Sequence, residues 1–390
     1  MSAPNHEQTH KTIRQLIKQL VSIKDESGQF LMPLEDGRII DTKSWHTNSW
    51  EWTHGIGLYG IWKYYTLTSD PEILALIEDW FAQRFAAVGK DGATTKNINT
   101  MAVFLTLACV YEKTRNEAYR PWLETWAEWA MYELPRTEMG GMQHITYLTE
   151  NHQQLWDDTL MMTVMPLAKI GIVLNRREYV EEAKRQFLLH VTYLYDRTTG
   201  LFFHGWQFND KKQGGGHNFA NARWARGNSW LTIVLPEFLE LLEEDKSHPL
   251  PANDPLRVYL LSILNAQANA LLPLQEPSGM WRTLLDEPAD EGSYPEASAT
   301  AGFVFGLLMA KRKRYLEPVA DEAQDYAKTI RLAVRSLIEN ITPEGELLHT
   351  SFGTGMGDSL QFYKDIPKTS MPYGQAMAIM ALGEYARVFI

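Results

Sequence analysis

The chain has a single cysteine, no uncharged run long enough to span a membrane, and more acidic than basic side chains. Because Cys109 stands alone, the chain can form neither an internal disulfide nor a thiolate metal cluster, and this suits a reducing compartment. The net charge of −11 argues against a nucleic-acid partner, since phosphates are neutralised by clustered Lys and Arg. An anionic ligand would need a local cation rather than a general positive field.

Several catalytic signatures are missing as well. The chain has no Gly-x-Ser-x-Gly sequence, so a serine nucleophile on a sharp elbow is not indicated. His144 and His204 lack the HxxxH or HxxE spacing of metal ligands, and we expect neither a metal ion nor another cofactor. Residues 1–11 lack the apolar segment of a secretory signal, and with no membrane span in view we predict a cytoplasmic protein.

The chain does contain a pattern that occurs six times: a Gly-marked loop, a short polar segment and then an apolar stretch. The polar segments begin at Asn48, Asn97, Trp156, Arg226, Pro295 and Pro372. The loops ahead of them include Gly37, Gly92, Gly140-Gly141, Gly200, Gly279 and Gly345. Self-similarity at a period of about 50 residues or more indicates a repeat architecture.

Apolar residues recur at helical spacing in two kinds of segment. Six segments are amphipathic, as surface helices are, and six are more uniformly apolar, as buried helices are. The amphipathic ones are 9–23, 73–85, 118–132, 179–195, 256–272 and 321–338. The apolar ones are 55–65, 100–111, 159–170, 230–242, 300–311 and 373–388. We therefore predict an all-α fold, an (α/α)6 barrel of six hairpins in one domain, 1–390. Its first helix would pack on its last, and the polar segments would share one mouth.

Two adjacent acids, Asp157 and Asp158, follow Trp156 at the start of an apolar stretch. An Asp in that position commonly caps a helix, and we expect one of the two to do so. The other would then be free to act. A carboxyl walled by Trp156 and Met161 would have a raised pKa, as a general acid needs.

Arg226 lies between Trp224 and Trp230 in the sequence. It is either a surface arginine stacked on tryptophan or a cation that grips a ligand carboxylate while the Trp faces hold a sugar ring. The segment alone does not decide between them. His144 and His204 each follow a Gly-marked loop by a similar step, which favours a lining role for both. Trp52 either stacks on a ring or packs the first hairpin.

Taken together, these segments resemble glycoside hydrolase family 105, the unsaturated rhamnogalacturonyl hydrolases, and more loosely family 88. The resemblance lies in WEWTHG at Trp50, GG-x-x-H ending at His144, LWDDTLMM at Leu155, LFFHGW at Leu201, WARGNSW at Trp224 and YPEASATA at Tyr294. It covers residues 50–300, and the segments occur in the family's order. It implies the same (α/α)6 barrel.

The resemblance also implies an unusual reaction. These enzymes hydrate the C4=C5 double bond of an unsaturated uronic acid, left by a polysaccharide lyase, instead of attacking the glycosidic bond directly. One Asp protonates C4 and assists the addition of water at C5. The hemiketal then opens and releases the sugar. The enzymes are thus an exception to the rule of two catalytic carboxylates.

The family's W-x-D motif places the catalytic acid at Asp158. Sugar-contacting positions of the family match His144, Trp156, His204, Trp224, Arg226 and Trp230, and Trp52 matches an aromatic wall. Where some members carry a second Asp, this chain has Asn99, which could tune the acid only by hydrogen bonding. The expected ligand is a disaccharide or short oligosaccharide with an unsaturated uronic acid.

Three alternatives remain open from the sequence. One is an unsaturated glucuronyl hydrolase that acts on fragments of another polysaccharide. The second is an (α/α)6 sugar epimerase with histidine as acid and base, although WDD and WARGNSW favour the hydratase. The third is a non-catalytic sugar-binding protein, against which the intact Asp158 and Arg226 both count.

Overall fold

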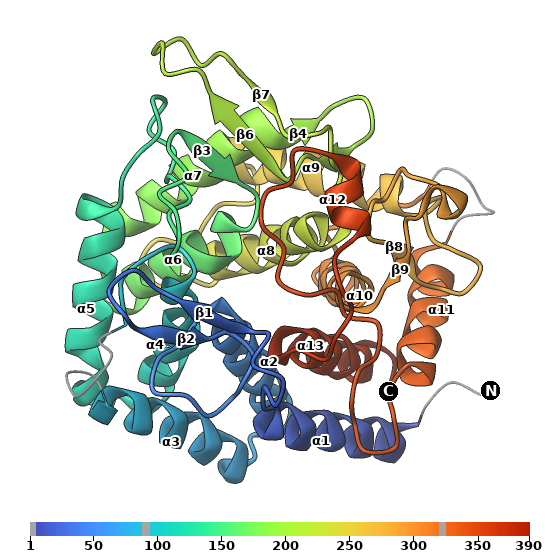
Figure 1. Ribbon diagram of the computed structural model, residues 1–390. Coiled ribbons are helices and arrows are strands. Elements are labelled where there is room, and N and C mark those ends of the chain that lie inside the picture. The colour runs from blue at the N-terminus through green and yellow to red at the C-terminus, as the bar shows by residue number, and fades with distance from the viewer. Residues whose placement is uncertain (1–4, 88–93, 320–324) are drawn as a thin grey trace.

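The computed structural model describes residues 5–87, 94–319 and 325–390 (Figure 1). Gly92 and the first residues of the helix predicted from 321 lie outside these ranges. The described chain is mostly helical, and its helices form two concentric rings, as the alternation of apolar and amphipathic segments predicts.

The inner ring consists of the helices that grow from the uniformly apolar segments. They are α2 (Trp52–Thr68), α4 (Val103–Thr114), α6 (Met165–Val173), α8 (Ala225–Glu243), α10 (Ala297–Arg312) and α13 (Pro372–Phe389). A 3-10 turn (Thr100–Ala102) leads into α4, and a π-helical turn (Leu160–Val164) leads into α6. All but the last two residues of α10 are buried, which explains why this segment shows no polar face.

The outer ring consists of α1 (His6–Ser22), α3 (Pro71–Ala87), α5 (Arg120–Glu128), α7 (Arg177–Leu194), α9 (Pro255–Leu271) and α11 (Tyr326–Glu339). A 3-10 turn (Glu117–Tyr119) precedes α5 and a π-helical turn (Trp129–Glu133) continues it. Helix α1 buries one stripe, with Ile13, Leu16 and Leu20 fully inside. It packs on α13, and α13 packs on α2, so the predicted closure of the ring is confirmed.

Small residues let the inner helices come close together. A Cβ on Gly60 of α2 would lie 2.7 Å from the Cβ of Ala376 on α13, and one on Gly306 of α10 would lie 2.2 Å from the carbonyl oxygen of Thr232 on α8. Glycine has no Cβ, so it permits these contacts. The small residues of the apolar stretches therefore belong to the helix–helix contacts of the inner ring.

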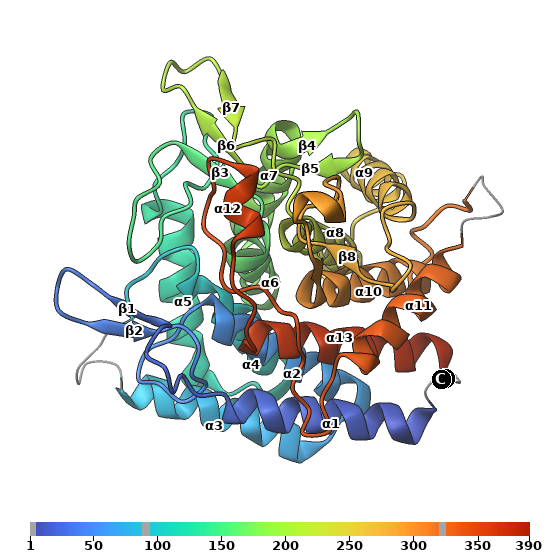
Figure 2. The ribbon, with the colours of Figure 1, turned by 45° about the vertical axis from the view of Figure 1, so that its right-hand side comes forward.

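Each inner helix begins at the same end of the barrel, and the loops before them carry short strands (Figures 1 and 2). The strands form β1 (Leu31–Pro33) with β2 (Ile39–Asp41), β3 (Gln154–Trp156) with β6 (Gly205–Phe208) and β7 (Gly216–Asn218), β4 (Tyr195–Asp196) with β5 (Leu201–Phe202), and β8 (Trp281–Arg282) with β9 (Pro295–Glu296), all antiparallel. A 3-10 turn (Ala289–Glu291) and the short α12 (Leu360–Lys364) complete them. The Gly-marked loops were predicted, but these strands and α12 were not.

Five of the predicted Gly-marked loops contain a glycine with positive φ. These are Gly37, Gly140, Gly200, Gly279 and Gly345, with φ between +79° and +96°. Such angles are rare for residues with a side chain, so the glycines mark the turns of the repeat. Within the described ranges, no helix combines the length and the apolar character needed to cross a bilayer.

Candidate active site

The polar segments surround a cavity of about 630 Å³ at the end of the barrel where the inner helices begin. Seven of the nine predicted site residues line it: Trp52, Asn99, His144, Trp156, Asp158, Trp224 and Trp230. The rest of its wall comes from the β1 strand and the residues before it, from 146–149, from Phe352–Gly355 and from Thr42, Glu51, Thr53 and Met371. His204 and Arg226 lie outside the lining.

Asp157 and Asp158 lie side by side between β3 and the π-helical turn that starts at Leu160. The Asp158 side chain is 13% exposed and lines the cavity, whereas Asp157 is fully buried behind it. The prediction that one of them caps the helix is wrong. The capping position is Thr159, its side chain makes no capping bond, and neither oxygen of Asp157 has a hydrogen-bond partner in the described chain.

Burial raises the pKa of both carboxyl groups. The pKa of Asp158 rises to about 7, with the positive charge of Arg226 acting in the opposite direction. The pKa of Asp157 rises well above its ordinary value because of burial and of the neighbouring Asp158. The raised pKa that the sequence predicts for a general acid at this position is therefore confirmed.

His144 lies next to Asp158 at the cavity wall. Its Nδ1 is 2.8 Å from Oγ1 of Thr159 and 3.4 Å from Oδ1 of Asp158, and its ring stacks on Trp156 with centroids 4.1 Å apart. Burial holds the pKa of His144 well below its ordinary value, so the ring is neutral. A neutral imidazole in this position does not stabilise the negative charge of Asp158 as a cation would.

A second carboxyl group, Glu51, lines the cavity and was not assigned to the site from the sequence. It is the N-cap of α2, where its side chain accepts from the N–H of Trp52 at 3.0 Å, and the backbone N–H of Glu51 donates to His54 Nδ1 at 3.1 Å. Burial raises its pKa to about 8, while the side chain of Asn99 acts to lower it. Asn99 thus lies beside the Glu51 carboxyl. The sequence feature that could have identified Glu51 is the WEWTHG segment, which contains it.

Aromatic rings form another part of the wall. Trp52 stacks on Tyr373 with centroids 4.4 Å apart and meets Trp230 edge-on at 6.3 Å. Trp224 is buried and lines the cavity as well. Flat apolar faces of this kind are suited to stacking on a ring, and Trp52 belongs to this wall as predicted.

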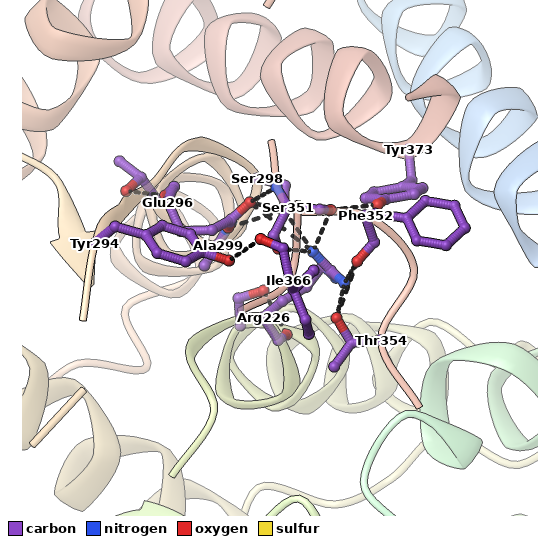
Figure 3. A network of polar contacts seen from close by, with 12 residues as sticks. Arg226, Tyr294, Glu296, Ser298, Ala299, Ser351, Phe352, Thr354, Ile366 and Tyr373 are labelled. Carbon is purple, nitrogen blue, oxygen red and sulfur yellow. Dashed lines mark hydrogen bonds and ion pairs between the residues drawn. The ribbon is translucent and has the colours of Figure 1, made fainter. Parts of the chain in front are cut away.

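Arg226 is fully buried behind the cavity wall, and its place differs from the expected one (Figure 3). Its guanidinium lies between the rings of Trp224 and Tyr373, at 4.6 and 4.9 Å, and not between Trp224 and Trp230. Its Nη atoms donate to the carbonyl oxygens of Ser351 and Phe352, both at 2.9 Å, to Oγ of Ser351 at 2.5 Å and to Oγ1 of Thr354 at 2.8 Å. It is therefore neither a surface residue nor part of the cavity lining.

His204 is also buried behind the wall. Its Nδ1 hydrogen-bonds the hydroxyl of Tyr363 at 2.8 Å, and its ring lies 4.4 Å from Trp224 and 5.5 Å from Trp156. Burial and Arg226 lower its pKa to about 3, so it is neutral. The ring supports two tryptophans of the wall, and its Nε2 has no partner within the described chain.

The lining contains no lysine or arginine among the described residues. No group of three His, Cys, Asp or Glu side chains in the described ranges is arranged to hold a metal ion. The structure therefore offers one partly exposed carboxyl with a raised pKa, Asp158, facing an aromatic cavity of the size of a small saccharide.

A family model described as Glycosyl Hydrolase Family 88 matches residues 22–389. The chain is similar to the protein of Bacillus subtilis (strain 168) named "Unsaturated rhamnogalacturonyl hydrolase YesR", with 28% identity over 86% of this chain and 89% of that protein.

Two solved structures are also similar to the chain. A possible member of family GH105 from Salmonella enterica serovar Paratyphi A is 60% identical, with a TM-score of 0.90 over 99% of this chain and 97% of its own. A possible member of the same family from Klebsiella pneumoniae is 58% identical, with a TM-score of 0.90 over 99% and 95% of the two chains.

Proposed function

Because the chain belongs to glycosyl hydrolase family 88, as the match over residues 22–389 shows, we propose that it is an unsaturated rhamnogalacturonyl hydrolase. The substrate would be a disaccharide or short oligosaccharide that a pectin lyase leaves with a C4=C5 double bond in its terminal uronic acid. The name of the Bacillus relative and the two family 105 structures support this choice. The cytoplasm stays the predicted compartment.

The observation that carries the proposal is the environment of Asp158. A carboxyl with a pKa of about 7 is present in both its acid and its base form near neutral pH. The protonated form can donate its proton to C4 of the unsaturated uronate. The resulting carboxylate can then take a proton from the water that adds to C5, so Asp158 ends the cycle protonated. The hemiketal at C5 opens, and the bond to the partner sugar breaks.

The rest of the cavity supports this sequence of steps. His144 and Thr159 lie beside Asp158, and the neutral state of His144 leaves the pKa of the acid high. The rings of Trp52, Trp156 and Trp230 provide flat faces for the sugar. Because the wall is largely apolar, it strengthens the electrostatic interactions that act on the transition state.

The test is the loss of ultraviolet absorbance of the unsaturated uronate when the purified protein is added to lyase-generated disaccharides. The panel contains a rhamnogalacturonan disaccharide and unsaturated glucuronyl disaccharides from other polysaccharides. We expect the fastest loss with the rhamnogalacturonan product. Faster turnover of a glucuronyl disaccharide would assign the chain to the alternative substrate class, and turnover of none would contradict the proposal.

A further inference from the structure

A uronate substrate carries a carboxylate, yet the described cavity lining has no lysine or arginine to pair with it. The two acidic residues of the lining, Glu51 and Asp158, have raised pKa values of about 8 and about 7, so they repel an anion weakly at neutral pH. The carboxylate must therefore be recognised by neutral hydrogen-bond donors. The segment Gly353–Met356 provides such donors.

This segment has four consecutive backbone N–H groups without an acceptor in the described chain. The neighbouring amides are satisfied, since Phe352 N–H donates to the oxygen of Pro367 at 2.8 Å and Gly357 N–H to the hydroxyl of Tyr363 at 3.3 Å. Gly353, Thr354 and Gly355 line the cavity. Backbone N–H groups without an acceptor at a cavity wall are available to hydrogen-bond an anion.

The backbone conformation does not require glycine at position 353 or 355. Neither has a positive φ. A Cβ on Gly355 would meet no atom within 4 Å, and one on Gly353 would meet only the ring of Trp52, at 3.6 Å. A glycine that lines a cavity and is free of internal constraint leaves room for a ligand to approach the backbone closely.

Arg226 holds this loop from behind (Figure 3). It donates to the carbonyl oxygens of Ser351 and Phe352 at 2.9 Å and to Thr354 Oγ1 at 2.8 Å. In a trans peptide the N–H points away from the C=O, so the bond to the Phe352 carbonyl directs the Gly353 N–H away from Arg226. The buried guanidinium also polarises this peptide, which strengthens its N–H as a donor.

We propose that the backbone amides of Gly353–Met356 bind the carboxylate of the substrate, and that Arg226 is the positioning residue that holds them. The proposal deepens the proposed function, on which it rests, by naming where the uronate group lies. In this arrangement Arg226 does not contact the carboxylate directly. It orders the N–H groups that do, and its positive charge polarises their peptides.

A direct test needs no turnover. Protein labelled with ¹⁵N-glycine is titrated with glucuronate and, separately, with glucose. Glycine-to-alanine substitution at 353 and at 355 assigns the two amide signals. We expect both signals to shift with glucuronate and to stay in place with glucose. Equal responses to the two sugars, or no response to glucuronate, would overturn the proposal.

A kinetic test uses Gly353→Ala and Gly355→Ala, with Gly383→Ala in α13 as the matched control. A Cβ on Gly383 also meets nothing within 4 Å, and this position lies outside the cavity lining. We expect kcat/KM on the unsaturated disaccharide to fall about ten- to a hundred-fold in the two loop variants, as for the loss of one charge-assisted hydrogen bond. The control should match the wild-type protein in activity, and all three variants should have the melting temperature of the wild-type protein.

The same variants are assayed on a substrate whose carboxylate is replaced by the uncharged carboxamide. The preference of the wild-type protein for the carboxylate should shrink in the loop variants. An equal loss on both substrates would show that the added methyl group merely blocks the cavity, and the proposal would fall. If no unsaturated uronide is turned over but glucuronate still shifts the glycine signals selectively, the subsite stands and the proposed function falls.

Discussion

The acidic pair at the mouth of the barrel and the buried glutamate toward its other end differ in their polar partners. At the mouth, neither oxygen of Asp157 has a hydrogen-bond partner in the described chain, and Asp158 has no cation in direct contact. Toward the other end, where the inner helices finish, Glu237 of α8 accepts from the hydroxyl of Tyr59 and pairs with Lys63 of α2, both at 2.5 Å.

More ion pairs surround Glu237 at that end. Arg312 of α10 pairs with Glu384 of α13, and both Arg312 and Lys313 lie within 3.5 Å of Glu240. Burial acts to raise the pKa of Glu240, but Lys63, Lys313 and Arg312 outweigh it and hold the pKa below its ordinary value. The pairs of Arg312 and Lys313 join neighbouring inner helices, and the pair of Lys63 with Glu237 joins α2 to α8 across the ring. The comparison indicates that carboxyls at this end stabilise the ring, whereas Asp157 and Asp158 at the mouth have no cation in direct contact within the described ranges, which suits a role in proton transfer.

Asp158→Asn should produce the largest effect. Asparagine keeps the shape of the side chain but cannot deliver a proton, so we expect kcat to fall by at least about a hundred-fold. Steady-state kinetics with a thermal melt on the same variant measures this. Near-normal turnover in a folded variant would contradict the assignment of Asp158.

Arg226→Ala should come next and should affect both activity and stability. It removes the donors to Ser351, Phe352 and Thr354 and leaves the buried Glu296, 3.9 Å away, without its cation. Removing one partner of a buried pair costs about 3–5 kcal/mol. We expect a lower melting temperature and a fall in kcat/KM of about ten- to a hundred-fold from the disordered loop.

Arg226→Lys is the matched control for that prediction. Lysine keeps the charge but lacks the planar fork with which Arg226 reaches two carbonyls and two hydroxyls. It should restore part of the stability and less of the activity. A full kinetic rescue by lysine would mean that charge alone matters, and the brace on the 351–354 loop would have no role.

The position of Arg226 also shows which structural features could be predicted from the sequence and which could not. Periodicity located both rings of helices because each helix is decided by residues close together in the chain. Trp224 was correctly paired with Arg226 for the same reason. The second ring against the guanidinium belongs to Tyr373, and its acceptors belong to the 351–354 loop, both far along the chain. Only the closure of the barrel brings these segments together.

Other features of the site also divide into those that nearby residues determine and those that they do not. The WDD segment predicted a carboxyl with a raised pKa at the mouth, since a neighbouring tryptophan and an apolar helix are local facts. That neither Asp side chain caps the helix, and that Glu51 joins the cavity, depend on the exact helix starts at Leu160 and Trp52. Composition does not fix such positions to a single residue.

The pH dependence should follow Asp158. Its protonated form starts the reaction, so kcat/KM should be constant below about pH 7 and fall about ten-fold per pH unit above it. A raised pKa in the folded state gives stability that is present below the ordinary value of 3.8 and is lost as the pH rises through about 7. Asp158→Asn should therefore melt higher than the wild-type protein at pH 8, and this advantage should shrink at pH 5. A rate that rises above pH 7 would contradict the role as an acid.

Asp157→Asn should reduce activity far less than Asp158→Asn. Burial and the neighbouring Asp158 raise the pKa of the Asp157 carboxyl well above its ordinary value, which favours the protonated form that asparagine resembles, and Asp157 does not line the cavity. We expect less than about a ten-fold loss in kcat, below the range typical of a general acid. A loss as large as that of Asp158→Asn, in a folded protein, would assign the proton transfer to the pair rather than to Asp158.

Glu237→Gln should have the smallest effect on activity and a clear effect on stability. Glutamine keeps an acceptor for Tyr59 but removes the negative charge that pairs with Lys63, and a charge-assisted hydrogen bond contributes about 1.5–3 kcal/mol. The free energy of unfolding should fall by that order while kcat/KM stays at the wild-type value, because Glu237 lies outside the cavity lining. Chemical denaturation and steady-state kinetics on one preparation measure both quantities. A fall in kcat/KM without a fall in stability would show that the end opposite the mouth acts on the site, and the separation between the two ends would not hold.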